Sequence, residues 1–302
     1  MPATLELDRV SKTFSEVRAV SELSFAARPG AVFGLLGPNG AGKTTTIRMI
    51  LDIISPDSGS VRWQGKLVDA DLRHTFGYLP EERGLYPKMK VRDQLTFFAL
   101  LHGAQAGAAR QRIDELAQAL NLTENLAKAP NELSKGNQQK VQFIAAVAHD
   151  PPLLVLDEPF SGFDPINVEV VKGTIRDLVA RGTTVLLSSH RMEQVEELCE
   201  DICIIDRSRA VLAGNLREIK HNWPDRYVRM TAVAPQFLPQ FPGAQVLPSR
   251  DGYLDVKLPP SFAPAELLRA AMAGGPIDHF EVVEPSLNDI YLSAVKPEVH
   301  SA

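Results

Sequence analysis

The sequence predicts an α/β fold, with a mostly parallel core sheet, an antiparallel β subdomain and a helical insertion, followed by a small α+β domain. Three observations lead to this prediction. An apolar strand at residues 31–36 runs into a glycine-rich loop and a helix. Two further apolar segments, 151–159 and 183–189, end in polar residues, as buried parallel strands often do. From about residue 222 the pattern changes to short strands and helices separated by prolines.

The composition is that of an ordinary globular protein. The 302 residues suffice for one large or two smaller domains, and 44% of them are hydrophobic. The formal net charge of −5 gives no electrostatic footprint for nucleic acid. The chain has no apolar run of about 18 residues, and its first residues lack the basic start and apolar stretch of a secretion signal. The sequence therefore predicts neither a membrane span nor secretion.

Residues 4–30 alternate apolar and polar side chains, which predicts antiparallel strands with one solvated face. Phe14 lies between two of these alternating segments. Taken alone, an aromatic residue in such a place is commoner in a core than against a ligand. Both interpretations stay open at this point.

The loop after residue 36 fits the phosphate-binding pattern, a glycine-rich segment that ends in Gly-Lys-Thr. Glycines let the backbone approach a polyanion, and the helix that follows turns its positive end to the same place. The lysine adds a charge for the phosphates, and the threonine hydroxyl is placed to ligate Mg²⁺. The alternative, a glycine-rich turn with a solvated lysine, is disfavoured by the flanking strand and helix. The loop consists of Gly37, Pro38, Asn39, Gly40, Ala41, Gly42, Lys43, Thr44 and Thr45.

Between this loop and the next buried strand the chain changes character. Residues 55–60 form a turn cluster, and 61–65 a short strand. An apolar strand at 76–80 leads into the charged segment 81–84. Residues 91–149 then carry apolar side chains at helical spacing, which predicts a mostly helical insertion.

Charged side chains follow the two buried strands beyond the insertion. Asp157 and Glu158 end the first strand, and His190 follows the second. An acidic pair at the end of an apolar strand needs counter-charge or solvent, and open parallel sheets bind ligands at the carboxyl ends of their strands. We therefore expect these three side chains near the glycine-rich loop. A helix at 192–200 and a strand at 202–206 complete the predicted core.

The remaining candidate metal ligands form no pattern. Cys199 and Cys203 are the only cysteines, and two reduced thiols are expected rather than a disulfide or a metal pair. The seven histidines show no ligand spacing.

The C-terminal residues predict a small α+β domain in which nothing has a catalytic pattern. Ser286 and Asp289 form a capping box for its last helix, and Asp251-Gly252 is a turn between strands. The predicted elements are strands at 227–233, 245–247, 253–258 and 277–283, a helix at 264–272, and the final helix.

In this order the motifs resemble those of the ATP-binding cassette family, the nucleotide-hydrolysing subunits of ABC transporters. The glycine-rich loop is similar to the Walker A motif, and the strand ending at Asp157, with Glu158 next, to Walker B. Residues 133–137 are similar to the family signature, 161–164 to the D-loop, and His190 to the switch histidine. The resemblance covers about residues 4–220. It implies a P-loop cassette at 4–221, with its helical subdomain at about 91–149, and a C-terminal domain at 222–302.

The resemblance implies that the chain binds and hydrolyses ATP with Mg²⁺. Catalysis is expected from Lys43, from Glu158, which would orient or deprotonate the attacking water, and from His190, which would contact the γ-phosphate. Further nucleotide contacts are expected from the Walker A loop and from Ser134 and Gly136 of a second copy, since the chain has only one Walker A motif. Finally, Mg²⁺ is expected at Thr44, Glu81 and Asp157, and adenine against Phe14.

Two places depart from the family pattern. Glu81 stands where the family usually has glutamine, and its carboxylate adds a negative charge beside an already acidic site. Lys135 and Asn137 replace a glycine and a glutamine of the signature. Lys135 either places a positive charge near the partner's phosphates or is a solvated lysine, and both readings stay open.

The segment 285–292 is similar to the tail on ATPase subunits of ABC-2-type exporters. The cassette resemblance as a whole implies a separate transmembrane permease subunit and a cytoplasmic location, peripheral on the inner face of the cell membrane. It also implies a second ATP-binding subunit, for which an identical copy is expected and a similar second chain stays open. A cassette ATPase acting on nucleic acid or ribosomes is disfavoured, because such relatives usually carry two cassettes or a long coiled coil. A nucleotide sensor that does not hydrolyse ATP is disfavoured by Glu158 beside Walker B.

Overall fold

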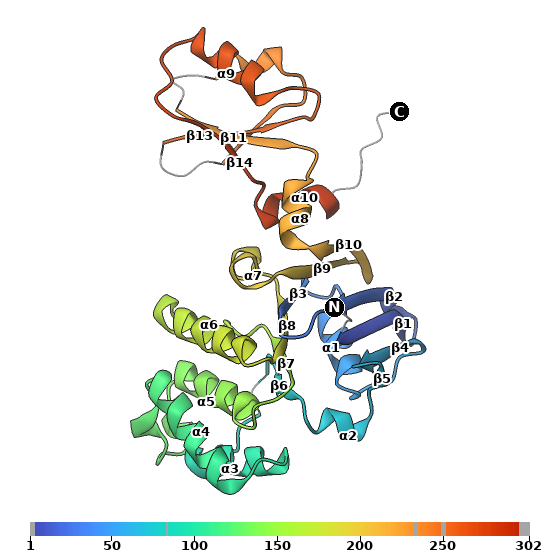
Figure 1. Cartoon of the computed structure of the whole chain (residues 1–302), viewed down its shortest axis with the longest axis vertical. Coiled ribbons are helices and arrows are strands. Elements are labelled where there is room, and N and C mark those ends of the chain that lie inside the picture. Colours follow the sequence, from blue (N-terminus) through green and yellow to red (C-terminus); the bar gives the residue numbers. More distant parts are fainter. Residues whose placement is uncertain (1–3, 83, 232–234, 249–251, 296–302) are drawn as a thin grey trace. The chain divides into compact units, whose positions relative to one another are not determined.

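The computed structural model describes residues 4–82, 84–231, 235–248 and 252–295. The chain divides into two compact units, Met1–Asn215 and Leu216–Ala302 (Figure 1). The sequence predicts a boundary near residue 222, and the contacts place the helix α8 (Leu216–His221) with the second unit.

The first unit is built on a six-stranded sheet in the order β10-β9-β3-β8-β7-β6. All neighbouring strands in it run parallel except β10, which is antiparallel to β9. This is the mostly parallel core sheet that the sequence predicts. The strands are β3 (Val32–Leu36), β6 (Gly77–Leu79), β7 (Leu153–Asp157), β8 (Thr184–Ser189), β9 (Asp201–Asp206) and β10 (Arg209–Asn215).

An antiparallel sheet in the order β2-β1-β4-β5 lies beside it, as predicted for residues 4–30. One correction concerns the predicted turn at 55–60, because Ser58 to Ser60 already belong to β4, where Ser58 pairs with Ser11 of β1. The pairing supplies backbone hydrogen bonds that a local reading of a serine-rich stretch does not reveal. The strands are β1 (Leu5–Phe14), β2 (Val17–Ala27), β4 (Ser58–Trp63) and β5 (Lys66–Leu67).

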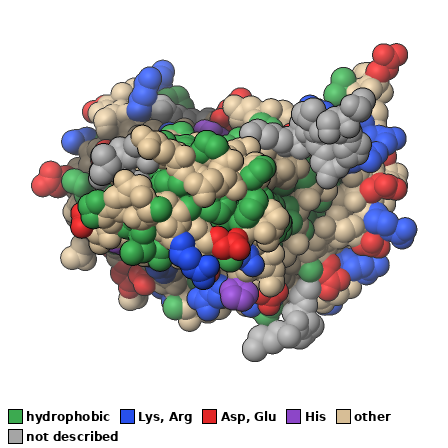
Figure 2. All heavy atoms as spheres, turned by 90° about the horizontal axis from the view of Figure 1, so that it is seen from above, with side chains coloured by type: hydrophobic (Ala, Val, Ile, Leu, Met, Phe, Trp, Pro, Cys, Tyr) green, Lys and Arg blue, Asp and Glu red, His purple; other side chains and the backbone are tan. Residues whose placement is uncertain are grey.

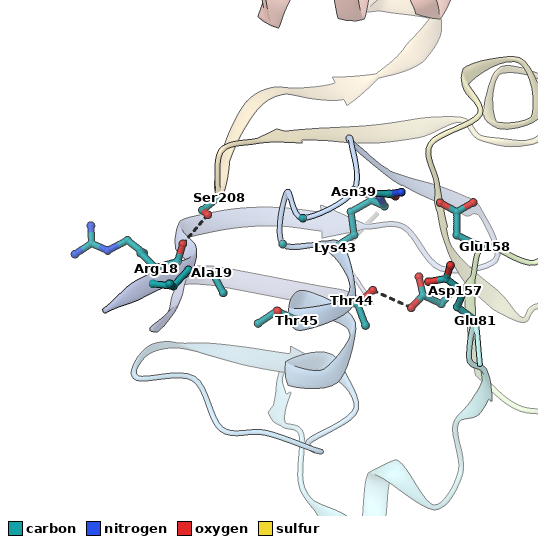
Figure 3. Close-up of a pocket in the computed structure, with 13 residues that line it drawn as sticks. Arg18, Ala19, Asn39, Lys43, Thr44, Thr45, Glu81, Asp157, Glu158 and Ser208 are labelled. Carbon is teal, nitrogen blue, oxygen red and sulfur yellow. Dashed lines mark hydrogen bonds between the residues drawn. The ribbon is translucent and has the colours of Figure 1, made fainter. Parts of the chain in front are cut away.

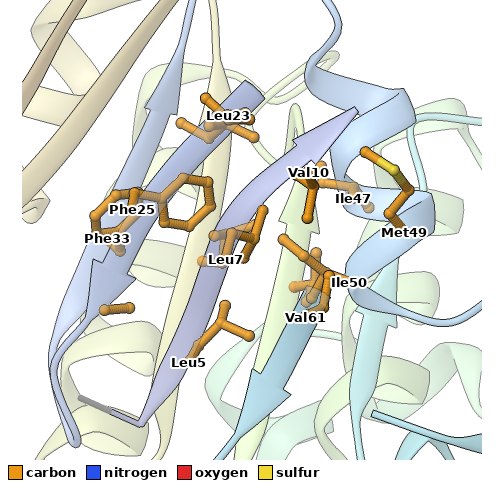
Figure 4. Packing of buried hydrophobic residues seen from close by; sticks show 14 of the residues in the cluster. Leu5, Leu7, Val10, Leu23, Phe25, Phe33, Ile47, Met49, Ile50 and Val61 are labelled. Atoms are coloured by element: carbon orange, nitrogen blue, oxygen red, sulfur yellow. The ribbon is translucent and has the colours of Figure 1, made fainter. Parts of the chain in front are cut away.

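The apolar core between these sheets includes the helix α1 (Lys43–Ile50). Figure 4 shows Leu7 and Val10 of β1 pointing toward Ile47 and Ile50 of α1. Phe25 and Phe33 stack with their ring centroids 4.6 Å apart. Because α1 begins directly after the glycine-rich loop, this core fixes the position of that loop.

The predicted helical insertion is confirmed. Between residues 91 and 149 the chain forms three helices and two short 3₁₀ turns, and in Figure 1 the three helices lie together, away from the antiparallel sheet. Leu95, Ile113 and Ile144 are among its fully buried residues. The helices of the first unit after α1 are α2 (Ala70–Arg73), α3 (Val91–Leu101), α4 (Ala106–Ala119), α5 (Lys135–Val147), α6 (Pro165–Ala180) and α7 (Met192–Leu198).

The second unit has its own antiparallel sheet, in the order β12-β13-β11-β14, and its own core. Ser286 and Asp289 form the predicted capping box, in which each backbone N–H donates to the other residue's side chain. Asp251 of the predicted turn lies outside the described residues. The elements after α8 are β11 (Arg226–Met230), β12 (Gln245–Leu247), β13 (Leu254–Leu258), α9 (Pro264–Met272), β14 (Phe280–Val283) and α10 (Leu287–Val295).

Two surface properties bear on function. Within the described ranges, no helix is both long enough and apolar enough to cross a bilayer. The face seen in Figure 2 mixes Lys and Arg with Asp and Glu and presents no field of one sign.

Candidate active site

The loop between β3 and α1 can only be made with glycine at two of its positions. Gly37 has φ 153°, and a Cβ on it would lie 2.2 Å from the carbonyl oxygen of Ile205. Gly42 has φ 111°, and a Cβ there would lie 2.4 Å from the carbonyl oxygen of Ala19. Gly42 is also the N-cap of α1, and no side chain caps that end. The loop thus leaves the N–H groups of the helix start available to an anion.

Lys43 is the first residue of α1 and is 6% exposed. Its ammonium donates hydrogen bonds to the carbonyl oxygens of Gly37 (2.8 Å) and Pro38 (3.2 Å). Burial lowers the pKa of Lys43, and the nearby carboxylates of Glu158, Asp157 and Glu81 oppose that shift. The lysine is therefore a buried cation above the loop, with acidic groups facing it.

Asp157 ends β7 and is 1% exposed. Thr44 donates its hydroxyl to Oδ2 of Asp157 at 3.1 Å, and Ser188 of β8 donates to Oδ1. Asp157 and Ser188 face each other in the parallel register of β7 and β8. Two hydroxyl donors therefore hold this buried carboxylate in place.

The donor set fits Mg²⁺. Thr44, Asp157 and Glu81 all offer oxygen and line one cavity, described below. In the described part of the chain, no three His, Cys, Asp or Glu residues are grouped so that they could hold a metal ion by themselves. Mg²⁺ commonly takes one or two carboxylates and completes its shell with water and phosphate oxygens. These residues therefore suit an Mg²⁺ that arrives with a nucleotide.

Glu158 follows Asp157 with φ 51° and is 8% exposed. Its Oε1 accepts the backbone N–H of His190 at 2.9 Å and lies 2.7 Å from Nδ1 of the His190 ring. Its Oε2 accepts the Ser189 hydroxyl at 3.3 Å. The carboxylate is thus held by the end of β8, as expected from the carboxyl ends of parallel strands.

These groups border a cavity of about 370 Å³ (Figure 3). It brings together most of the glycine-rich loop, Lys43, Thr44 and the three predicted carboxylates. Gly37, Pro38, Ala41 and His190 do not line it, although Lys43 and Glu158 bond to three of them. The lining residues are Val17, Arg18, Ala19, Asn39, Gly40, Gly42, Lys43, Thr44, Thr45, Glu81, Asp157, Glu158 and Ser208.

Phe14, predicted to stack on adenine, is not among the lining residues. Phe14 is 48% exposed as a residue, which removes the alternative of a core aromatic, and the Lys12 ammonium lies 5.7 Å from the centroid of its ring. The lining does include Arg18 and Ser208, which the sequence does not predict. Ser208 donates its hydroxyl to the Arg18 carbonyl at 2.7 Å. The two residues come from separate hairpins, so only the tertiary fold brings them together.

Ser134 and Gly136, predicted to serve the nucleotide of a second copy, lie apart from this cavity. Ser134 is the N-cap of α5 and accepts the Asn137 N–H at 3.3 Å. A Cβ on Gly136 would meet only the carbonyl oxygen of Gly162, at 3.9 Å. The start of α5 is therefore open, and Gly162 of the predicted D-loop lies beside it.

Cys199 and Cys203 are buried free thiols, as predicted. Burial raises the pKa of both, in the case of Cys203 to about 12. Both side chains are therefore uncharged and unreactive at neutral pH.

A second, mostly apolar cavity of about 300 Å³ lies near the ends of α3 and α5 and contains a stacked pair of histidines. The rings of His102 and His149 are 4.3 Å apart and 15° from parallel. Both ring nitrogens of His149 are buried, and the nearby backbone of Phe76 and Thr75 favours the protonated ring. Burial, helped by His102, lowers the pKa of His149 to about 4.

Comparisons with known proteins follow the division of the chain. Residues 20–161 match the family described as ABC transporter, and residues 214–295 match the C-terminal domain of ATP-binding proteins like DrrA1-3. The chain is 45% identical over 293 residues to the uncharacterized ABC transporter ATP-binding protein YhaQ of Bacillus subtilis (strain 168), covering 96% of this chain and 98% of that protein.

Two further comparisons each cover about seven tenths of this chain. The Nod factor export ATP-binding protein I of Paraburkholderia xenovorans (strain LB400) is 38% identical over 215 residues, or 70% of this chain and 71% of that protein. A solved structure of an ATP-binding subunit of an ABC transporter superposes with a TM-score of 0.69 at 29% identity, covering 73% of this chain and 93% of the other.

Proposed function

The chain belongs to the ATP-binding subunits of ABC transporters, and we propose that it binds Mg²⁺-ATP in the cavity beside the β3–α1 loop and powers an exporter in the membrane. One observation carries the proposal. The Thr44–Asp157 pair and the Glu158–His190 pair meet at the ends of adjacent parallel strands, next to the open start of α1. This arrangement supports a phosphate site, a metal position and a base within one cavity.

The phosphate end of the cavity is a ready anion site. The N–H groups at the start of α1 and the Lys43 ammonium supply positive charge for a triphosphate. Lys43 already donates to two loop carbonyls, so its amine is held in place before the nucleotide arrives. Thr44, Asp157 and Glu81 would hold Mg²⁺, which would neutralise phosphate charge when bound.

Glu158 is the candidate general base. Its carboxylate lines the cavity one residue beyond Asp157, and His190 and Ser189 orient it. A carboxylate in hydrogen-bond reach of the attacking water can accept its proton. His190 Nδ1 faces Glu158, so the far nitrogen of the half-exposed ring remains for a phosphate oxygen.

A second copy of the chain is part of the proposal. Ser134 and Gly136 stand at the open start of α5, away from the cavity of their own chain. A helix start with exposed N–H groups suits an anion, and the anion would be the ATP held by the other copy. The isologous arrangement of a two-fold dimer would complete both sites at once.

The export direction and the membrane partner rest on similarity. The second unit resembles the C-terminal domain of DrrA-like proteins, and one relative is a Nod factor export protein. A separate permease would hold the chain peripherally on the cytoplasmic face of the cell membrane. Nucleic acid is a poor candidate partner, because the net charge of −5 gives no attraction to a polyanion.

The test has two arms. Purified protein should release phosphate from ATP only with Mg²⁺, and Lys43→Ala should remove both ATP binding and hydrolysis. Lys128→Gln, at an exposed lysine outside the cavity, is the matched control. In the second arm, the chain should float with membrane vesicles only when a transmembrane permease subunit that it binds is co-expressed. Normal activity of Lys43→Ala would contradict the site, and flotation without the membrane protein would contradict the proposed docking.

A further inference from the structure

Glu81 is an acidic group with no partner in direct contact, and Glu158 and Asp157 share its nearby cation, Lys43. It lines the nucleotide cavity together with Asp157 and Glu158. Within the described residues, no hydrogen bond or ion pair engages the Glu81 carboxylate, whereas hydroxyl or ring donors hold the other two. The cations on the same cavity wall are Arg18 and Lys43. The cavity that must accept a triphosphate therefore carries more negative than positive groups.

Lys135 is a positively charged residue without an ion-pair partner among the described residues. It is the first residue of α5 and is exposed. A helix start carries partial positive charge, so a lysine there is electrostatically unfavourable. The first turn of α5 contains no acidic residue, and no ion pair to Lys135 occurs among the described side chains. The N-cap Ser134 only satisfies the Asn137 N–H. An anion brought to this helix start would relieve the conflict.

We propose that Glu81 and Lys135 are coupled between copies: in the ATP-bound dimer, the partner's Lys135 offsets the charge that Glu81 adds beside the phosphates. The inference rests on the proposed function, since the start of α5 reaches a triphosphate only in that dimer. Two-fold symmetry repeats the pair at both sites. Charges brought together out of water interact more strongly than surface ion pairs, because solvent screening falls.

The coupling predicts a specific dependence. Loss of the Lys135 charge weakens the ATP-bound dimer most when Glu81 keeps its carboxylate. When Glu81 is made neutral, removing the Lys135 charge weakens the ATP-bound dimer less, because less negative charge remains beside the phosphates. If Lys135 is merely solvated, its replacement should change dimer stability equally in the chain with Glu81 and in the chain with Glu81→Gln.

A double-mutant cycle measures this directly. Full-length protein carrying Glu158→Gln, which slows hydrolysis, is studied with Mg²⁺-ATP by sedimentation to obtain the dimer dissociation constant. Lys135→Gln should raise that constant by about tenfold, and by at least about threefold less when Glu81→Gln is also present. Lys135→Arg keeps the charge and should stay within about twofold of the parent. Lys128→Gln is the matched control, because it removes another exposed lysine of the same region.

Two further measurements separate the outcomes. Urea unfolding of each variant shows that it is folded, and binding of fluorescent ATP at concentrations below dimerisation reports the cavity alone. If the effects of Lys135→Gln and Glu81→Gln simply multiply, the coupling is wrong, while the proposed function stands. If the Glu158→Gln parent binds ATP yet forms no dimer, the two-copy mechanism fails and the coupling fails with it.

Discussion

At the scale of single residues, the Glu158 carboxylate is held by three donors from the end of β8. Its Oε1 meets the backbone N–H and the ring of His190, and its Oε2 meets the Ser189 hydroxyl. These contacts fix the orientation of the carboxylate. They also occupy some of the lone pairs of its two oxygens, to which an attacking water would have to donate. The orientation of the Glu158 carboxylate therefore depends on the position of His190.

Replacing Glu158 with Gln tests its assignment as the base. The amide keeps the size and can still bond to His190, but it cannot accept a proton. Steady-state phosphate release should fall by about 10²–10⁴-fold. Affinity for ATP, measured by equilibrium binding, should be retained. The matched control is Glu193→Gln, at an exposed glutamate in the first turn of α7, which should hydrolyse ATP normally. Turnover that persists in Glu158→Gln would assign the proton to another group.

Sequence alone could predict those site residues that lie in continuous motifs. The glycine-rich loop, Asp157 and Glu158 each follow an apolar strand, so local pattern and strand-end chemistry coincide. Ser188 could have been found as well, because it is the last residue but one of β8, which runs parallel to β7, and it faces Asp157 there. Arg18 and Ser208 could not, since two hairpins distant in the sequence bring them together. Adenine stacking on Phe14 stays a prediction.

At the scale of elements, the β3–α1 loop joins a strand to a helix under tight steric limits. Gly37 and Gly40 both have positive φ, of 153° and 79°. They differ in space, because a Cβ on Gly37 would strike the Ile205 backbone, whereas a Cβ on Gly40 would meet no atom within 4 Å. Comparing substitutions at Gly37 and Gly40 therefore distinguishes the cost of backbone strain from the cost of a steric clash.

We expect Gly40→Ala to lower the free energy of unfolding by about 1–2 kcal/mol, the usual cost of left-handed backbone for an L-residue. Gly37→Ala should cost more, because displacement of β9 is added to the strain. Urea unfolding of the two variants measures the difference. Equal losses would mean that the loop moves freely away from Ile205.

A pH effect is expected where α3 and α5 end side by side. The pKa of His149 is about 4 in the fold, against an ordinary value of 6.5. Between these values the unfolded chain binds a proton that the folded chain does not. The free energy of unfolding should therefore fall as pH drops from about 6.5 to 4, by up to about 3 kcal/mol from this group.

The variant His149→Phe keeps a ring beside His102 and removes the titration. Its free energy of unfolding, measured by urea between pH 4 and 7, should depend less on pH than that of the parent. His221→Phe, at an exposed position of α8, is the control and should keep the parental slope. An unchanged slope in His149→Phe would show that His149 titrates alike in both states.

Among the elements, those with buried faces were the easiest to predict, and α6 shows the exception. No helix is predicted between residues 159 and 183, yet α6 buries Val171, Ile175 and Leu178 at helical spacing, and Asp164 caps its start. The apolar spacing and the capping aspartate that predict this helix were present in the sequence. The strand β10 is different, because it is mostly exposed and depends on pairing with β9. Its side chains carry little pattern that a sequence could reveal.

At the scale of the whole molecule, each unit has its own core. Every residue that lines the cavity beside the β3–α1 loop belongs to the first unit. In the second unit, Val228, Met230, Val256 and Leu267 are at most 1% exposed and belong to one cluster. A segment of this length with a buried core is within the range of independent domains. The sequence predicts the same two-part organisation from the change in pattern near residue 222.

Separate production of the two units tests this organisation. The fragment 1–215 should bind ATP with less than about a threefold change in affinity, or under about 0.7 kcal/mol, because it keeps the whole cavity. The fragment 216–302 should unfold cooperatively in urea, because its sheet and α9 enclose a common core. Calorimetry of the full chain should then show a transition for each unit. A fragment 1–215 that folds but loses ATP affinity by tenfold or more would mean that the second unit stabilises the nucleotide site, and its role would then be regulatory rather than independent.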